Sequence, residues 1–289
     1  MKYQISLFFL VAGLTSCTPM KLTVPDVFKE QATSYHVSGS HRNKMSFDVY
    51  STSRIRRGLH VQYPGWSRIF FPENLVYNKV GHNKQESVMH EKAKFHYKLS
   101  DGHTYLEVFG KERDLKRNLE YSLENNHDIF NYIRPLKSSL LSSQNNFTYV
   151  QPQEHRYIFS AVIKTDTLVN GNSWELIMSN VYERENDTTK SLFSFIRLDD
   201  NGFATNGVDS IFIKPVTLKN AEGPGGQKST FPIKLLIGYE LNTLDGVIAI
   251  IDLVDSNVWL YNELNAKERL VIAGITTALF ARKVKDAKW

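Results

Sequence analysis

Closely spaced strand-like segments constrain the fold of this chain more than any other feature of its sequence. Between residues 157 and 261, seven short stretches rich in β-branched and aromatic residues follow one another, each bounded by Asn, Asp or Gly. Such spacing is typical of sheets whose strands are joined by short turns. The stretches are residues 157–164, 174–182, 192–198, 211–218, 233–241, 247–254 and 258–261. We therefore expect a second half dominated by antiparallel sheet.

Several local patterns add detail to this expected sheet. Residues 247–251 (VIAII) are apolar at consecutive positions, which is typical of an interior strand covered on both faces. Asn201-Gly202 and Asp245-Gly246 favour the tight turns of hairpins, because these residue types tolerate a positive φ. In the first half of the chain, further short strands are expected at residues 45–50, 55–63 and 68–71.

The clearest local unit is a hairpin with Asp101-Gly102 as its two-residue turn. This turn pairs Ser100 with His103, and the side chains of each strand then alternate between two faces. One face collects the apolar side chains and is expected to point into the core. Its members are Phe95, Tyr97, Leu99, Leu106 and Val108.

Two segments have the apolar spacing of helices. Residues 112–133 keep a roughly helical period, and Pro135 ends it. Near the C-terminus, Asn265 can cap a helix, and Glu268 completes a capping box. The apolar stripe of this helix consists of Val271, Ile275, Ala278 and Leu279. The sequence thus predicts an α+β fold, predominantly antiparallel β, with the C-terminal helix packed on one face of the sheet.

The only long apolar run lies at the N-terminal end of the chain. Apolar residues 5–14 follow a short positive start and precede Leu14-Thr15-Ser16-Cys17. This arrangement is typical of a secretory signal, and ten apolar residues are too few to span a bilayer. The last four residues resemble the lipobox of bacterial lipoproteins. The resemblance implies cleavage before Cys17 and lipidation of its thiol, whereas the alternatives are an ordinary signal peptide with a chance cysteine or an uncleaved anchor.

Lipidation at Cys17 implies a location as well as an anchor. Several acyl chains hold a protein on a membrane far more strongly than one chain does. Thr18, rather than Asp, follows the cysteine, and no run of acidic residues comes after it. By the resemblance, these features favour the outer membrane and its periplasmic side.

The expected organisation has three parts. A lipoprotein signal peptide occupies residues 1–16, and residues 17–44 are expected to be a tether, since they lack a sustained period and are rich in polar and turn residues. A sheet-rich globular region follows over residues 45–289. Its only candidate internal boundary is the Ser/Gln/Asn-rich stretch 137–155, which could equally be a long loop within one domain.

The C-terminal quarter contains the segments GYEL, DGVIAIIDL, VWLYNEL and ERLVIAGITTALFARK. Together they resemble the closing segment of uncharacterised lipoproteins of Bacteroidota. The matched positions are mostly of core type, so the resemblance implies a related fold and carries no activity to any residue.

Metal and disulfide chemistry find little support in the sequence. A single cysteine excludes an intramolecular disulfide and any Cys-rich zinc site. Four histidines fall close together, at positions 82, 90, 96 and 103. In the expected hairpin, however, His96 faces Glu107 and His103 lies ~13 Å further along, so they cannot share an ion.

Other partial motifs also lack a required part. Residues 223–229 (GPGGQKS) have no Gly directly before the Lys and no following helix, as a phosphate loop needs. The acidic residues around Asp199 and Asp200 lack the order of a calcium loop, and no G-x-S-x-G motif is present. We therefore predict no catalytic residues, no metal and no cofactor.

The densest basic and aromatic stretch supplies the candidate contact residues. Arg54, Arg56, Tyr63 and Trp66 could contact anionic headgroups or a glycan, with the aromatic rings stacking. The alternative is that the arginines are the ordinary charged dressing of an edge strand.

These features predict a membrane-anchored envelope lipoprotein with a non-catalytic binding or assembly role. Its partners would be the membrane, through the lipid anchor, and an envelope protein or glycan. The alternative is an envelope hydrolase whose catalytic residues are dispersed along the chain. The net charge of +5 is too mild to indicate nucleic-acid binding.

Overall fold

A computed structural model describes residues 22–40, 42–62, 82–123, 147–165, 173–186, 200–222 and 228–282. These residues form one 13-stranded sheet, the helices α2 (Asp26–Gln31) and α5 (Ala266–Ala281), and the short 3-10 helix η4 (Arg184–Asn186). The first strands are β1 (Ala32–His36), β2 (Ser46–Phe47), β3 (Tyr50–Thr52), β4 (Arg56–Gln62), β5 (His82–Ser100), β6 (Tyr105–Leu123) and β7 (Phe147–Thr165). The remaining strands are β8 (Trp174–Glu183), β9 (Asn201–Thr205), β10 (Ser210–Glu222), β11 (Lys228–Thr243), β12 (Gly246–Asp252) and β13 (Asn257–Tyr261).

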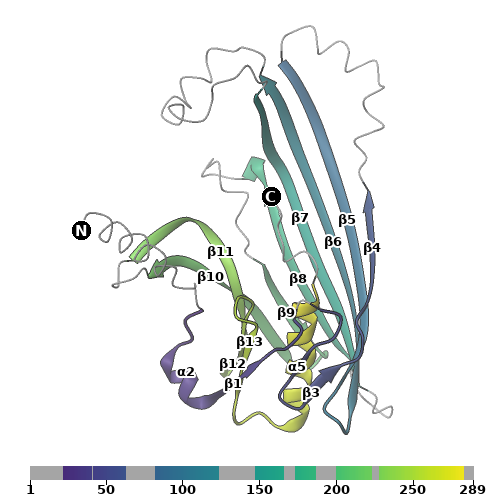
Figure 1. Ribbon diagram of the computed structural model, residues 1–289, viewed down its shortest axis with the longest axis vertical. Coiled ribbons are helices and arrows are strands. Elements are labelled where there is room, and N and C mark those ends of the chain that lie inside the picture. Colours follow the sequence, from purple (N-terminus) through teal and green to yellow (C-terminus); the bar gives the residue numbers. More distant parts are fainter. Residues whose placement is uncertain are drawn as a thin grey trace, which may run out of the picture.

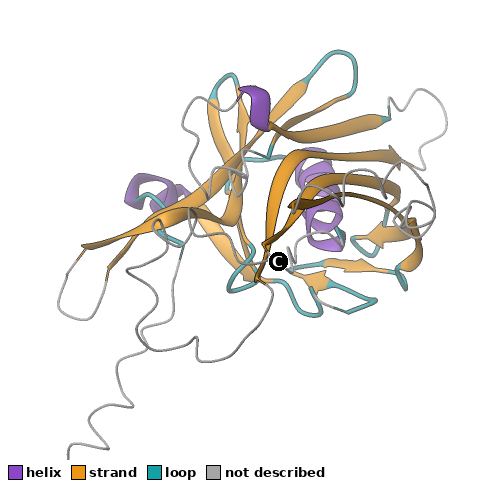
Figure 2. Cartoon of the chain, turned by 90° about the horizontal axis from the view of Figure 1, so that it is seen from above, coloured by secondary structure: helices purple, strands orange, loops and turns teal. Residues whose placement is uncertain are grey.

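All neighbouring strands are antiparallel, and most neighbours in the sheet are also neighbours in sequence. The order runs β1-β13-β12-β11-β10-β9-β8-β7-β6-β5-β3-β2, with β4 pairing β5 beside this path. The long strands β5, β6 and β7 extend well beyond α5 (Figure 1). Seen from above, the sheet curves around α5 until it is nearly closed (Figure 2). The predominantly antiparallel β character expected from the sequence is therefore confirmed.

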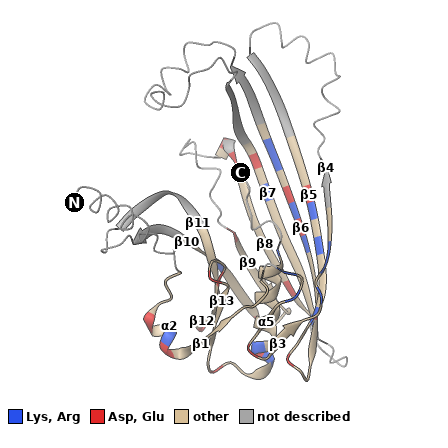
Figure 3. Cartoon of the chain, viewed as in Figure 1, with Lys and Arg blue, Asp and Glu red and all other residues tan. Residues whose placement is uncertain are grey.

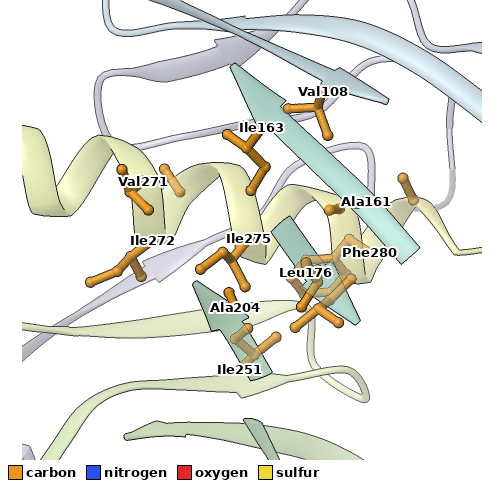
Figure 4. Packing of buried hydrophobic residues seen from close by; sticks show 14 of the residues in the cluster. Val108, Ala161, Ile163, Leu176, Ala204, Ile251, Val271, Ile272, Ile275 and Phe280 are labelled. Carbon is orange, nitrogen blue, oxygen red and sulfur yellow. The ribbon is translucent and has the colours of Figure 1, made fainter. Parts of the chain in front are cut away.

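Helix α5 lies inside the curved sheet rather than on one flat face. Every residue from Leu270 to Ala281 is buried, so the helix has no solvent-facing side over its last three turns. A helix that is apolar all round must be enclosed. Figure 4 shows Val271, Ile272 and Ile275 surrounded by side chains of distant strands, including Ile163, Leu176 and Ile251. The stripe predicted from the sequence is part of this buried surface, and the expectation of packing on a single face was too narrow.

The predicted N-terminal cap of α5 is confirmed. The Asn265 side chain accepts a hydrogen bond from the Glu268 amide at 3.0 Å, and the Glu268 side chain accepts one from the Asn265 amide at 2.9 Å. This reciprocal pair satisfies two of the amides that a helix start leaves without partners.

The β5–β6 hairpin has the predicted core face but a different register. Ser100 pairs with Tyr105, and Asp101 closes a four-residue loop by accepting from the amides of His103 and Thr104 at 2.9 and 2.7 Å. A shift of two residues leaves each side chain on its face, because the side-chain period is two. All five predicted core residues are buried. The expected His96–Glu107 pair is wrong, since His96 pairs with Phe109.

The helix predicted over residues 112–133 is also wrong in its described part. Strand β6 continues through these residues to Leu123 and pairs with both β5 and β7. Two ladders of backbone hydrogen bonds outweigh the weak helical spacing of a few leucines. The remainder of that prediction, residues 124–133, lies outside the described residues.

Most of the expected tether is part of the fold. From Leu22 onward the chain packs on the sheet, and Val24, Phe28 and Ala32 form a second small core with Ile250. This second core covers the outer face of β12, while Ala249 and Ile251 face α5's side of the sheet. The apolar run at residues 247–251 is thus an interior strand covered on both faces, as predicted.

Of the candidate boundary at residues 137–155, residues 137–146 lie outside the described residues, and the rest belongs to the sheet. Strand β7 begins at Phe147 and pairs with β6 along its length, so residues 147–155 are not a linker. Six of the seven strands predicted in the second half are confirmed, and residues 192–198 lie outside the described residues, as do residues 68–71. The hairpin predicted at Asp245-Gly246 is present, but its two-residue loop is Leu244-Asp245, because Gly246 pairs with Thr243 and begins β12. Asn201-Gly202 lies within β9 and forms no hairpin turn.

Gly110 provides a test of the packing between β5 and β6. A Cβ at this position would lie 2.1 Å from Cζ of Phe95, whose ring covers the glycine. We expect Gly110→Ala to lower the free energy of unfolding by ~1–3 kcal/mol through overpacking. Gly58→Ala is the matched control, because its Cβ would meet only the flexible Lys94 chain, at 3.0 Å. Urea unfolding measures the stability of both variants. Equal stability of Gly110→Ala and Gly58→Ala would contradict this packing.

Candidate functional site

The inner face of the sheet changes from apolar to polar along β6 and β7. On β6, Leu106 and Val108 face α5, and the next inward-facing side chains are Glu112 and Asp114, both 2% exposed. The change occurs where α5 ends. Charged residues continue along the middle parts of β5, β6 and β7, beyond the end of α5 (Figure 3). The end of α5 is therefore the place to look for buried chemistry.

Arg282, the residue after α5, lies at the centre of a buried polar cluster. Its guanidinium donates to Asp200 Oδ2 at 2.6 Å, to Tyr239 Oη at 2.6 Å and to Tyr157 Oη at 2.9 Å. Tyr157 in turn donates to Glu112 Oε2 at 3.1 Å. The cluster thus joins four strands or their ends to the C-terminal end of the helix.

Burial governs the protonation states in this cluster. It raises the pKa of Tyr157 and Tyr239 well above the usual value for tyrosine, so both hydroxyls remain protonated. Burial also lowers the pKa of Arg282, but the facing tyrosines and Asp200 outweigh it and raise the pKa overall. Arg282 is therefore a permanent cation facing a carboxylate. With its side chain only 5% exposed, it acts as a structural clamp on α5.

Two residues beyond Glu112 on β6, Asp114 forms a second buried polar group on the inner face. Its Oδ1 lies 2.7 Å from His155 Nε2, and its Oδ2 lies 3.0 Å from Lys116 Nζ. Burial raises the pKa of Asp114, but the hydrogen bond and charge of His155, together with Lys116, outweigh burial and lower it overall. The Asp114 side chain is only 1% exposed, which leaves no open approach for a substrate.

An open site among the described residues is a basic groove near β3 and the start of β4. It consists of two adjoining depressions, of about 560 and 730 Å³, which share Asn43 and Arg54. The cationic lining residues are Arg42, Lys44, Arg54, Arg56 and Arg57, and the polar ones include Ser38, Ser46 and Ser53. No described acidic residue lines either depression. We call these residues the basic groove.

Buried neighbours hold the backbone of the basic groove in place. Met45 and Ile55 are each at most 3% exposed and alternate with the exposed cations. The Ile55 amide donates to the Asn43 carbonyl at 2.7 Å, and the Met45 amide donates to the Thr52 hydroxyl at 2.8 Å. Gly39 has a φ of +73°, which a residue with a Cβ would adopt only with strain. The cations thus project from a fixed frame.

Arg57 connects the basic groove to the interior. It lies on the inward side of β4, opposite Phe95, and its guanidinium donates to the carbonyl of Ala281 at the end of α5. Burial lowers its pKa from the usual value, and the nearby Glu112 and Tyr97 oppose that shift. One arginine therefore satisfies a helix-end carbonyl while its neighbours face solvent.

The structure brings together only part of the site predicted from the sequence. Arg54 and Arg56 line the same depression, whereas Tyr63, Trp66 and Cys17 lie outside the described residues. Arg42 and Lys44 were missed because they were assigned to the tether. The local density of basic residues in HRNK was the signal that could have identified them.

Comparisons of the chain with known protein families, with curated proteins and with solved structures found no match. Within the described residues, no group of three or more His, Cys, Asp or Glu side chains is placed to hold a metal ion. The described part of the chain also contains no helix with the length and apolar character needed to cross a membrane.

Because Arg282 holds the end of α5, its replacement should lower the stability strongly, and a second substitution at Asp200 should restore part of it. Arg282→Met removes the cation and leaves the Asp200 carboxylate buried without a counter-charge, so we expect a loss of ~3–5 kcal/mol in the free energy of unfolding. The double variant Arg282→Met/Asp200→Asn removes both charges and should recover part of this loss. Urea unfolding checks both, and a double variant no more stable than the single one would contradict the charge pairing.

Asp114 predicts a pH dependence. A carboxyl whose pKa is lowered by folding contributes stability above its unfolded pKa, about 3.9, and loses that contribution as the pH falls through its lower folded pKa. Asp114→Asn should therefore be less stable than the unaltered chain at pH 7, and the difference should shrink below about pH 4. Asp245→Asn, in an exposed turn, is the control that should show no such trend. Thermal unfolding between pH 3 and 7 measures both; a constant difference for Asp114→Asn would count against its ion pairs.

Proposed function

We propose that this chain is a membrane-anchored lipoprotein of the cell envelope that acts by binding rather than by catalysis. The observation that carries the proposal is the basic groove, an open depression lined by five cations and by no described acidic residue. An unbalanced set of fixed cations at an open surface attracts an anionic partner. It offers none of the paired acid and base groups that bond cleavage needs.

The lipobox supports the proposed anchoring. Cys17 would be the lipidated residue, and the described fold begins at Leu22. Residues 18–21 then leave five Cα-to-Cα steps between the anchor and the fold, at most about 18 Å. On this proposal the folded part lies next to the lipid surface. Thr18 after the cysteine, together with the missing acidic run, favours the periplasmic side of the outer membrane.

A catalytic role as an envelope hydrolase has weaker support. The strongest acid–base pair among the described residues is Asp114 with His155, and their side chains are 1% and 10% exposed. A general base must come within hydrogen-bond reach of the substrate atom whose proton it takes. The pair is enclosed in the inner face of the sheet, and its contacts to Lys116 and between strands explain it as a structural element.

Replacement of the lipobox cysteine tests the anchor. We expect Cys17→Ser to remain unprocessed or to leave the membrane fraction, and to lose labelling by palmitate, because the thiol that receives the lipid is missing. Ser16→Ala keeps a small residue before the cysteine and is the matched control, with processing and labelling retained. Intact mass of the purified protein gives the third readout. Unchanged fractionation and labelling of Cys17→Ser would show that the proposed anchor is wrong.

A further inference from the structure

We infer that the basic groove binds the phosphate groups of anionic lipid headgroups, and so holds the folded part in a fixed orientation on the membrane. This inference rests on the proposed membrane anchoring. It adds a ligand, an orientation and a set of residues that the lipid anchor alone does not require.

The donors of the basic groove suit phosphate. Arg42, Arg54 and Arg56 are exposed, and they form no ion pair with a described acidic residue. Guanidinium groups bind phosphate oxygens through two parallel hydrogen bonds. The Ser53 hydroxyl accepts from the Lys98 amide at 2.9 Å, which leaves its own proton to donate to a ligand. The groove therefore offers donors and positive charge together.

The groove is built before any ligand arrives. Ser38 and Ser46 exchange backbone hydrogen bonds at 2.9 and 3.1 Å, and the Ser53 amide donates to the Lys98 carbonyl at 2.7 Å. Buried Ser40 contacts Ser256 at 2.8 Å and ties the same loop to the β12–β13 turn. A fixed frame lowers the entropy lost on binding, so a modest number of phosphate contacts is enough.

The position of the groove favours a lipid rather than a soluble anion. Helix α2, next to the start of the described chain, and strand β3, next to the groove, lie at the same end of the molecule, opposite the far ends of β5–β7 (Figure 1). Residues 18–21 would keep Leu22, four residues before α2, within about 18 Å of the proposed anchor. With this end of the molecule turned toward the lipid surface, each cation of the groove contributes to attraction by anionic headgroups.

The two adjoining depressions indicate more than one phosphate. They share Asn43 and Arg54, with Arg42 and Lys44 on one side and Arg56 and Arg57 on the other. Each depression thus has its own cations in addition to the shared Arg54 and could hold one phosphate. Two neighbouring headgroups in a membrane can occupy both depressions, because the lipid surface presents them side by side.

Hydrogen exchange of the full chain in an uncharged detergent tests the inference. Micelles are supplemented with increasing mole fractions of phosphatidylglycerol, with phosphatidylcholine in a parallel series, and exchange is followed in peptides covering residues 38–57. We expect phosphatidylglycerol, and not phosphatidylcholine, to slow exchange in these peptides. Because the micelle presents the lipid whether or not Cys17 is acylated, this result is independent of the test of the anchor.

Two double variants test whether the protection by phosphatidylglycerol depends on the basic groove. Arg54→Gln/Arg56→Gln should raise the half-saturating mole fraction of phosphatidylglycerol about 30-fold, since each cation near an anionic surface is worth about fivefold in affinity. Lys111→Gln/Lys214→Gln removes the same charge from exposed positions on β6 and β10 and should leave it unchanged. Unaltered exchange in peptides of β5–β7 verifies that the variants remain folded.

Three results would overturn the inference. Equal protection by both lipids, or an equal loss of binding in the two double variants, would mean that no specific groove site exists. Full protection by inorganic pyrophosphate in lipid-free detergent at the same phosphate concentration would make the groove a site for soluble phosphate compounds. Protection that requires phosphatidylglycerol and is lost only in the groove variant supports it.

Discussion

Enclosure of the apolar helix α5 by the sheet is the interaction on which the remaining structure depends. From Leu270 to Ala281 every side chain is buried, and the partners come from strands far apart in the sequence. A helix apolar on all sides is not stable at a surface, so the sheet must curve to cover it. The Arg282 clamp then fixes the helix end, with three hydrogen bonds from one guanidinium to Tyr157 on β7, Tyr239 on β11 and Asp200 just before β9.

Because the sheet encloses α5, charged residues on its inner face differ in their surroundings from those of the basic groove. Charges on the inner face are paired and buried, as with Arg282 and Asp200 or Asp114 and Lys116, and they stabilise one arrangement of strands. The charges of the basic groove other than Arg57 project outward from a rigid edge and pair with no described acidic residue. Only the second kind is available to a partner, which is why we place function there. Arg57 stands between them, on a groove strand but bonded to the helix end.

Local sequence patterns were sufficient to predict most strands and the helix cap, but not the strand register, the length of β6 or the whole basic groove. Alternation and turn residues predicted most strands, and the Asn265–Glu268 cap needed only two residues in one turn. The two-residue register shift at Ser100 could not be predicted from the sequence. Asp101 selects the longer loop through its hydrogen bonds, and a shift of two residues leaves the same side chains on each face of the hairpin. The length of β6 was missed for another reason, since it depends on pairing with β5 and β7. Arg42 was missed because its segment was assigned to the tether.

Strands β5, β6 and β7 are much longer than the helix that they enclose. Nineteen residues of strand extend about 65 Å, whereas the 16 residues of α5 extend only about 24 Å. The helix can fill less than half of the height of these strands. If the groove end is held at a lipid surface, as proposed, the opposite rim would stand some six nanometres from it, far enough to present a surface well clear of the bilayer.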